Sequence, residues 1–342
     1  MIFADKLLDS LLQNDLLTIN NQSHERTWGY YYEQYHKAFR VFLEIAMQKR
    51  YQTNRKFMPF MFIMRHSLEL FLKEKISKTM TAWEQYGTTH NLEKLYQFTN
   101  INDEEFLKHF DCLNCNSEGD CWRYVSDRNG SSYFKGRKKI HAFDACSYYC
   151  SFLDNDASFT NASEDKKLQW EPTFHTTNCH TLGIIGTQYD FAIKDILLAI
   201  QEGKISINDI YLPLLFLLRH SLELKLKASI IELGNVVKEQ DRYKVNNNHK
   251  VNYLYDVLSE HTDGAIESIT DSGFKKQSKN LRDVTIEYKN KIALLDANSY
   301  LFRFPKDRSG NDANFIPESD CVSEILKLYK LSLIHISEPT RL

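Results

Sequence analysis

The sequence contains few of the residues that interrupt helices, with only 12 Gly and 6 Pro among 342 residues. A fold of many short strands needs frequent turns, so this scarcity argues against a β-sandwich or a β-barrel. Leu, Lys and Glu, which favour helices, are abundant throughout the chain. The sequence therefore predicts an all-α protein.

Long apolar runs, a signal sequence and a strong net charge are also lacking. The longest apolar run, Leu212–Leu218, ends at Arg219 and is far shorter than the roughly 20 residues that cross a bilayer. The N-terminus lacks the basic-then-apolar pattern of a signal peptide, and the formal net charge of −2 gives no overall attraction to nucleic acid or to anionic lipid. Seven cysteines, an odd number in a chain of this size, are typical of a reducing compartment. We expect a cytoplasmic protein that contacts no membrane.

Signatures of common cofactor and metal sites are absent. The sequence has no Gly-rich phosphate loop, no H-E-x-x-H and no G-x-S-x-G. Cys112 and Cys115 form one Cys-x-x-Cys pair, and Cys121 follows, but residues 293–301 of the second half contain no cysteine. A zinc-stabilised interaction protein is thus the weakest interpretation. We expect reduced thiols, no metal and no cofactor.

One segment occurs twice. Residues 65–73 read RHSLELFLK and residues 219–227 read RHSLELKLK, so eight of nine positions agree at an offset of 154 residues. The same offset pairs Pro59 with Pro213. Further shared landmarks are Gln34 with Gln188, His90 with His249, and the nine residues from Trp122 with the nine from Phe302. Landmarks that recur in one order predict a tandem duplication.

Each copy predicts one helical bundle. The copies span residues 1–153, including an N-terminal helix, and residues 181–330, with a polar linker over 154–180. Within each copy we expect an amphipathic helix, a buried central helix headed by Pro, a helix capped by Thr88, Thr89 or Asn248, an Asp-Arg-x-Gly turn and a closing helix. The amphipathic helices are expected over 31–48 and 185–201, and the closing helices over 139–153 and 317–330. Residues 331–342 resemble a translated sequencing adapter and are left out of the fold prediction.

The central helices carry a cluster of charged residues. Arg65, Glu69 and Lys73 share one helix face, and His66 adjoins Arg65. The second copy repeats the cluster as Arg219, His220, Glu223 and Lys227. Burying such groups without partners would cost several kcal/mol, and Arg before Glu is the weaker order for a helical ion pair. We therefore expect supporting partners elsewhere in each bundle, namely His90 and Arg123 in the first copy and His249 and Arg303 in the second.

Two interpretations of this cluster stay open. It can be a buried network of ion pairs that fixes the register of the helices. Alternatively, Arg can hold a phosphate while His moves a proton, as cleavage of RNA through its 2′-hydroxyl requires. The predicted catalytic residues are then Arg65, His66, Glu69, Arg219, His220 and Glu223. The basic run 135–139 offers a further phosphate-binding surface, although a solvated helix start explains it better.

The repeated Arg-His-Ser-Leu-Glu-Leu-x-Leu-Lys helix, the His-x-(Leu/Val)-x-x-Leu segment after it and the Phe-Arg-Phe-Pro segment resemble the HEPN superfamily of bacterial helical bundles. The resemblance covers residues 30–153 and 181–330. It implies paired bundles, here an intramolecular pseudo-dimer, and a place in toxin–antitoxin, phage-defence or RNA-processing systems. RNA or a nucleotide, and an antitoxin or other protein, are the implied partners.

The chain departs from that family at its nuclease motif. Catalytic HEPN members carry Arg, four to six residues and then His, whereas His directly follows Arg65 and Arg219. The one formal match, Arg242 to His249, crosses an Asn-rich segment that has no counterpart in the first copy. We expect a HEPN-like protein acting on RNA or nucleotides, which as an enzyme would be a metal-independent endoribonuclease. The alternative is a non-catalytic binding or scaffold module.

Overall fold

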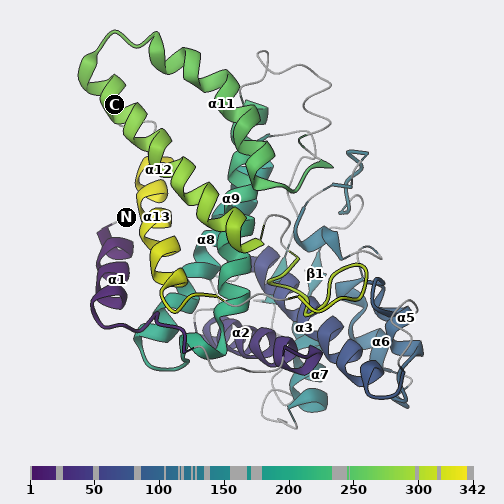
Figure 1. Ribbon diagram of the computed structural model, residues 1–342. Coiled ribbons are helices and arrows are strands. Elements are labelled where there is room, and N and C mark those ends of the chain that lie inside the picture. The colour runs from purple at the N-terminus through teal and green to yellow at the C-terminus, as the bar shows by residue number, and fades with distance from the viewer. Residues whose placement is uncertain are drawn as a thin grey trace.

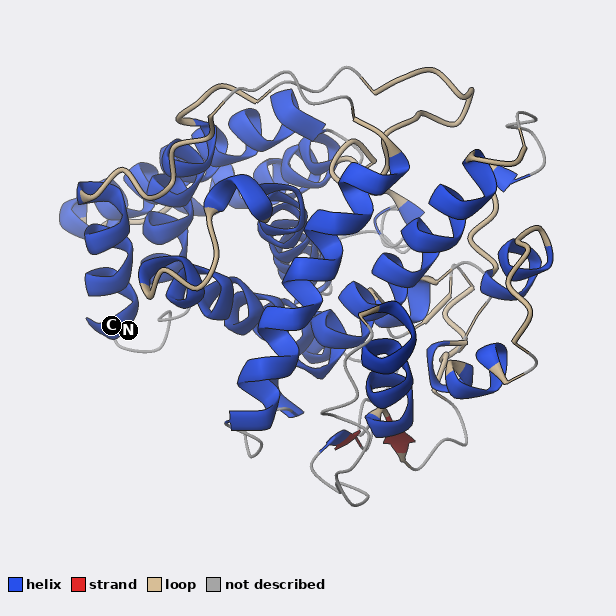
Figure 2. Ribbon diagram, turned by 90° about the horizontal axis from the view of Figure 1, so that it is seen from below, coloured by secondary structure: helices blue, strands red, loops and turns tan. Residues whose placement is uncertain are grey.

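The structure is a computed structural model in which the described part of the chain is predominantly helical (Figure 1). It describes residues 2–20, 26–48, 54–80, 86–103, 105–114, 116, 119–124, 126–127, 129–134, 139–154, 168–170, 179–232, 245, 247–296, 300–313 and 317–336. Figure 2 shows helices throughout and one small pair of strands. The predicted all-α class is confirmed. No helix among the described residues is long and apolar enough to cross a membrane.

The predicted helices occur in the predicted order, and two helices are additional. The α-helices are α1 (Ile2–Gln13), α2 (Trp28–Gln48), α3 (Phe57–Ser77), α5 (Leu92–Gln97), α6 (Phe106–His109), α7 (Phe143–Leu153), α8 (Cys179–Gln201), α9 (Tyr211–Glu232), α11 (Val251–Glu267), α12 (Ser272–Asp296) and α13 (Cys321–Ile336). Of these, α6 and the long helix α12 are the additional elements, which the sequence does not predict. Three short 3-10 turns are η2 (Asp111–Leu113), η3 (Asp120–Trp122) and η6 (Ile207–Asp209). The strands β1 (Ile140–His141) and β2 (Gln169–Trp170) pair antiparallel.

Helices α3 and α9 form the centre of the molecule. Every residue from Phe57 to Leu70 in α3 and from Tyr211 to Leu224 in α9 is buried. Pro59 and Pro213 each occupy the third position of their helix, where the backbone N–H that proline lacks has no partner within the helix. α2 packs against α3, and α8 packs against α9. The prediction of two buried central helices is confirmed.

The first and second halves of the chain exchange contacts near these helices. The Gln34 side-chain oxygen accepts from the Leu212 backbone N–H at 2.9 Å, and the Gln188 oxygen accepts from the Met58 N–H at 3.0 Å. Phe62 stacks on Phe216, with ring centroids 4.5 Å apart. The two glutamine contacts are equivalent, because the 154-residue offset of the repeat relates Gln34 to Gln188 and Met58 to Leu212, and the same offset relates Phe62 to Phe216. The two halves thus meet through equivalent surfaces.

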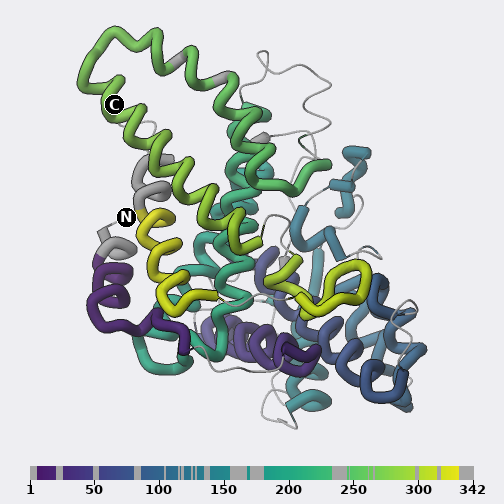
Figure 3. Tube along the Cα trace, in the orientation of Figure 1, coloured from purple at the N-terminus to yellow at the C-terminus, as the bar shows by residue number. Residues whose placement is uncertain are grey.

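The aromatic-Arg-aromatic segments end in matching turns. The N–H of Gly130 donates to the Asp127 carbonyl at 3.0 Å, and Gly310 donates to Asp307 at 3.1 Å. Both glycines have positive φ, 81° and 84°, which is why glycine is suited to this position. The predicted turn is confirmed in both copies. Figure 3 shows the yellow-green loop of residues 300–313 lying beside the blue helices of the first half.

Some local predictions are wrong. Asn91, rather than Thr88 or Thr89, caps α5 by accepting from Lys94 N–H at 3.0 Å. α11 begins after Lys250 without a side-chain cap, so Asn248 does not cap it. Within the predicted linker, residues 169–170 pair with β1, while residues 155–167 and 171–178 lie outside the described part.

Both chain ends lie on the second half. α1 packs against α8 and α13, and Lys330 pairs with Asp9 at 2.8 Å. The N-terminal helix assigned to the first bundle thus contacts the second. In the adapter-like segment, the backbone of residues 331–336 continues α13, and residues 337–342 lie outside the described part.

Candidate functional site: a cleft between the two halves

Glu69 is the centre of a buried network on α3. Its side chain is 2% exposed, and its carboxylate meets Arg65 at 3.2 Å and Lys73 at 3.0 Å. His90, which precedes α5, donates from Nδ1 to Glu69 Oε1 at 2.8 Å, while the Arg65 guanidinium donates to the His90 carbonyl at 2.6 Å. The three predicted catalytic residues of the first copy therefore lie together in the core with Lys73.

Glu223 is the centre of the same network on α9. Its fully buried carboxylate meets Arg219 at 2.8 Å, Lys227 at 3.1 Å and Nδ1 of His249 at 2.9 Å. Arg219 also donates to the His249 carbonyl. The partners that the sequence predicts for the central helices, His90 and His249, are correct.

The electrostatics of the two networks favour ionised carboxylates and neutral histidines. Burial alone would raise the pKa of Glu69 and Glu223. The charges of Lys73 and Lys227, with the two outer histidines (His90 and His249), hold both pKa values well below the usual range. Burial lowers the pKa of His66 well below its usual value and that of His220 to about 4, against the attraction of the neighbouring glutamate. Both buried imidazoles are therefore neutral at pH 7.

The buried histidines connect the two halves. Nε2 of His66 donates to the Arg303 carbonyl at 3.1 Å, and Nε2 of His220 donates to the Arg123 carbonyl at 3.3 Å. Both side chains are almost without exposure, at 3% and 0%. Their ring protons hold the backbone of the opposite half, so His66 and His220 have a structural role in this arrangement. Their predicted catalytic role stays a prediction. Burial argues against it, because a substrate cannot reach either ring in this arrangement.

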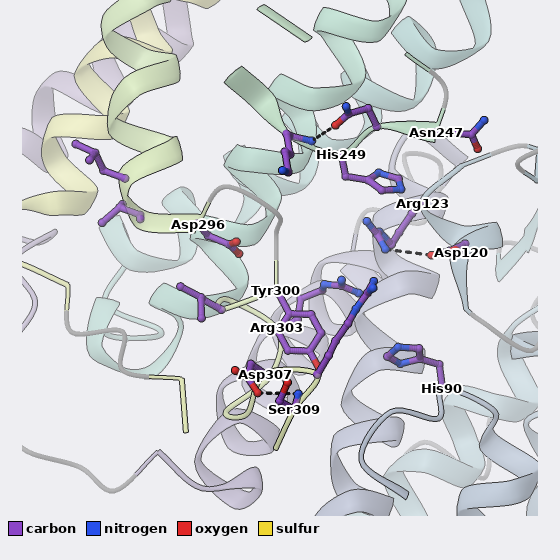
Figure 4. A pocket seen from close by; sticks show the side chains of 16 residues that line it. His90, Asp120, Arg123, Asn247, His249, Asp296, Tyr300, Arg303, Asp307 and Ser309 are labelled. Atoms are coloured by element: carbon purple, nitrogen blue, oxygen red, sulfur yellow. Dashed lines mark hydrogen bonds and ion pairs between the residues drawn. The ribbon is translucent and has the colours of Figure 1, made fainter. Parts of the chain in front are cut away.

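The supporting residues line one open cleft. A cavity of about 890 Å³ is bounded by His90, Arg123, His249 and Arg303, together with residues of α12 and of the loops around 247–250 and 300–309. Figure 4 shows all four side chains around this space, with Arg123 and Arg303 between the two histidines in that view. Of the six predicted supporting residues, His90, Arg123, His249 and Arg303 thus line the cleft, whereas Lys73, Lys227 and the predicted catalytic residues do not. The prediction that each arginine supports its own copy is wrong, because the Arg303 carbonyl accepts from His66 and the Arg123 carbonyl accepts from His220 of the opposite half.

The two arginines place positive charge in the cleft. Arg123 is 5% exposed and pairs with Asp120 at 3.0 Å, yet its Nε is buried and has no hydrogen-bond partner among the described residues. Burial and then the charge of Arg123 lower the pKa of Arg303 to about 10, so both guanidiniums remain charged at neutral pH. An anion bound between them would relieve their repulsion and occupy the unused donor.

The two outer histidines have one ring nitrogen fixed and one available. Because Nδ1 of each donates to a buried carboxylate, the proton of the neutral ring resides there, and Nε2 is left as an acceptor. The side chains of His90 and His249 are 23% and 34% exposed, and neither Nε2 has a partner among the described residues. A carboxylate that orients an imidazole in this way is the arrangement used in acid–base catalysis.

The sequence missed two aromatic residues that pack against the cleft histidines. Tyr124 and Phe304, each next to a predicted arginine, insert into the network of the opposite half, Tyr124 beside His249 and Phe304 beside His90. The repeat marks these two positions as equivalent. No signal in the sequence shows that the segments cross between halves, because that pairing depends on the tertiary fold. Two tyrosines of α2 also reach the second half: the Tyr30 hydroxyl donates to the Tyr211 hydroxyl on α9, and the Tyr31 hydroxyl donates to the Leu301 carbonyl.

The cysteines and the remaining predicted motifs contribute nothing to the cleft. No group of three or more His, Cys, Asp or Glu suited to a metal occurs among the described residues. Cys121 is disulfide-bonded, so the expectation of reduced thiols is wrong there, while Cys112, Cys146, Cys150 and Cys321 are free. Cys115, Arg242 and residues 135–138 of the basic run lie outside the described part.

Comparison of the chain with protein-family models, with curated proteins and with solved structures gave no match.

Proposed function

We propose that the protein binds RNA in the cleft between its halves and cleaves the phosphodiester backbone without a metal ion. The observation that carries this proposal is the meeting of two charged arginines and two carboxylate-oriented histidines, one of each from either half, around a single cavity. The arginines neutralise a phosphate, and the histidines accept and donate protons. The catalytic groups in this proposal are His90 and His249, not the buried His66 and His220.

We further propose that the chain is a duplicated, HEPN-like pseudo-dimer. Equivalent contacts of Gln34 and Gln188, of His66 and His220, and the stacking of Phe62 on Phe216 support this interpretation. An isologous interface between identical bundles would have the same reciprocal contacts. Together with the resemblance in sequence, these contacts support our proposal that the protein acts in a cytoplasmic bacterial RNA-directed system, of which phage defence and toxin–antitoxin pairs are examples.

The proposal is tested with the full chain, a labelled single-stranded RNA and excess EDTA. We expect the parent to cut the RNA, and His90→Ala or His249→Ala to lower the rate at least about a hundredfold. Each variant also removes one of several donors to a buried glutamate, so we expect a modest fall in melting temperature, and the rates are compared at a temperature at which circular dichroism shows the variants to be folded. Arg123→Ala should weaken RNA binding, and salt should weaken it less steeply than in the parent. His141→Ala removes an exposed histidine outside the cleft and is the matched control.

Two outcomes would contradict the proposal. A parent that binds RNA but never cuts it supports the binding-module alternative, which the ion pairs of the buried carboxylates also permit. Full activity in the His90→Ala and His249→Ala variants would exclude the cleft histidines as catalytic groups. His66→Ala with His220→Ala should instead lower the melting temperature, because both side chains are buried and bonded across the halves.

A further inference from the structure

The outer histidines His249 and His90 pack against different aromatic residues, Tyr124 and Phe304. Tyr124 and Phe304 occupy equivalent positions in the repeat and take nearly the same pose. Tyr124 lies 5.4 Å from the ring of His249 at an interplanar angle of 41°, and Phe304 lies 5.4 Å from the ring of His90 at 37°. Lys227 is 4.9 Å from the Tyr124 ring, and Lys73 is 4.8 Å from the Phe304 ring. The hydroxyl of Tyr124 is the only difference between the two aromatic rings.

That hydroxyl joins the carboxylate–histidine pair of the second half. It donates to Glu223 Oε1 at 2.6 Å and lies 2.9 Å from Nδ1 of His249. Burial raises the pKa of Tyr124 well above its usual value, so the phenol keeps its proton and remains a donor. Glu223 Oε1 therefore contacts Lys227, His249 and Tyr124, whereas Glu69 Oε1 contacts Lys73 and His90 and has no phenol beside it among the described residues.

The extra donor weakens the support for a positive charge on His249. The charged groups that face its ring are Glu223 and Lys227 on α9 and Arg123 from the first half. Burial, followed by the two cations, lowers the pKa of His249, and Glu223 opposes them. The Tyr124 phenol donates to the same Glu223 oxygen as His249. The carboxylate is then shared among three donors, so Glu223 raises the pKa of His249 less than it would without the phenol.

We propose that the Tyr124 hydroxyl makes the two halves of the cleft chemically different, with His249 as the proton acceptor of the cleavage reaction and His90 as the proton donor. Nε2 of His249 removes the proton of the ribose 2′-hydroxyl, whose oxygen attacks the phosphorus. The bond from phosphorus to the 5′-oxygen breaks, and protonated His90 gives its proton to that leaving oxygen. The products are a 2′,3′-cyclic phosphate and a 5′-hydroxyl, and water returns the protons to their starting positions. The assignment rests on the proposed ribonuclease function, in which Tyr124 is a positioning residue.

The first test measures the histidine and needs no activity. Tyr124→Phe copies Phe304, which occupies the equivalent position in the second half, so the variant should fold. Titration of the His249 ring by NMR should show its pKa rising by about 0.7 unit, as expected when one competing hydrogen bond to Glu223 is lost. An unchanged or lowered pKa of His249 would overturn the proposal.

The second test measures the pH–rate profile of RNA cleavage. The acidic limb reports the proton acceptor, so Tyr124→Phe should move this limb to higher pH and reduce the rate below it about fivefold. Phe304→Tyr adds the same oxygen beside His90 and is the matched control, because it should leave the acidic limb unchanged. If Phe304→Tyr shifts the acidic limb, the proton acceptor is His90 and the proposal is overturned.

Failure of the two proposals can be distinguished. A parent that cuts no RNA contradicts the ribonuclease function and removes the assignment of acceptor and donor with it. The NMR titration still shows by itself whether Tyr124 makes the two halves differ. If the parent cuts RNA and Tyr124→Phe has the same pH–rate profile as the parent, only the role of Tyr124 is contradicted.

Discussion

At the scale of single residues, the core contains ionised carboxylates because each has several donors. Glu69 and Glu223 each contact a lysine, an arginine and a histidine. An unpaired buried charge would cost several kcal/mol. The donors hold the pKa of both carboxyls well below the usual range, while burial holds His66 and His220 neutral. The network is therefore stable only while these protonation states persist.

This charge pattern predicts a loss of stability in acid. The pKa of His220 is about 4 in the folded protein and about 6.5 in the unfolded chain, so the unfolded chain binds the proton more readily. The stabilising effect of the neutral ring is complete above pH 6.5 and is lost as pH falls toward 4. Between these values the free energy of unfolding should fall by about 1.4 kcal/mol per pH unit for each such histidine. Protonation of Glu69 and Glu223 adds a further loss below about pH 4.5.

Urea unfolding at several pH values between 7.5 and 4.5 tests this prediction. His220→Asn keeps a donor for the Arg123 carbonyl but cannot titrate, and its slope with pH should be smaller by about 1.4 kcal/mol per unit. His141→Asn, at an exposed position, should keep the parent slope. If His220→Asn shows the same pH dependence as the parent, His220 does not titrate in the way that its burial implies.

At the scale of elements, the starts of the central helices depend on the opposite half. The first backbone N–H groups of a helix have no partners within it. Gln188 on α8 accepts from Met58 near the start of α3, and Gln34 on α2 accepts from Leu212 near the start of α9. Both glutamines are buried, so no water can replace them. Each half thus contributes to helix formation in the other.

Removal of these caps should destabilise the protein by similar amounts. Gln188→Leu leaves the Met58 N–H buried without an acceptor, which we expect to cost about 1–3 kcal/mol of unfolding free energy. Gln34→Leu should cost at least as much, because Gln34 also bonds Tyr30 and the Asn208 carbonyl. Gln201→Leu, at the exposed end of α8, is the control. Urea denaturation measures the difference, and a cost below about 0.5 kcal/mol for Gln188→Leu would show that the cap contributes little.

The sequence predicts most elements but few of the contacts between them. Spacing of apolar residues and the position of Pro59 and Pro213 identify the central helices, and the repeat identifies the Asp127 and Asp307 turns, because these signals are local. The partners His90 and His249 follow from the requirement that buried charge be paired. The role of Tyr124 does not follow, since its network lies on α9, almost a hundred residues away. Which of the histidines are exposed and which are buried also depends on packing between distant elements, so local sequence patterns do not predict it.

At the scale of the whole molecule, the halves are interdependent because they exchange segments. Phe304 of the second half packs on His66 and His90, and Tyr124 of the first half packs on His220 and His249. α1 likewise lies on α8 and α13. A half without its counterpart would expose these apolar surfaces and leave the starts of its helices without acceptors. The cleft itself consists of residues from both halves, so neither half contains a complete site.

This exchange predicts that neither half folds alone. Fragments 1–174 and 175–342 should each lack near-UV circular dichroism and cooperative unfolding, whereas co-expression should yield a 1:1 complex with restored cooperativity. The melting temperature of that complex should rise with concentration, because folding is then coupled to association. As a control, a protease site placed between residues 174 and 175 and cut after folding should leave both fragments in one particle. Cooperative unfolding of an isolated fragment near the melting temperature of the intact chain would contradict the interdependence, since a half can be that stable only if the exchanged segments and cross-half caps contribute little to its core.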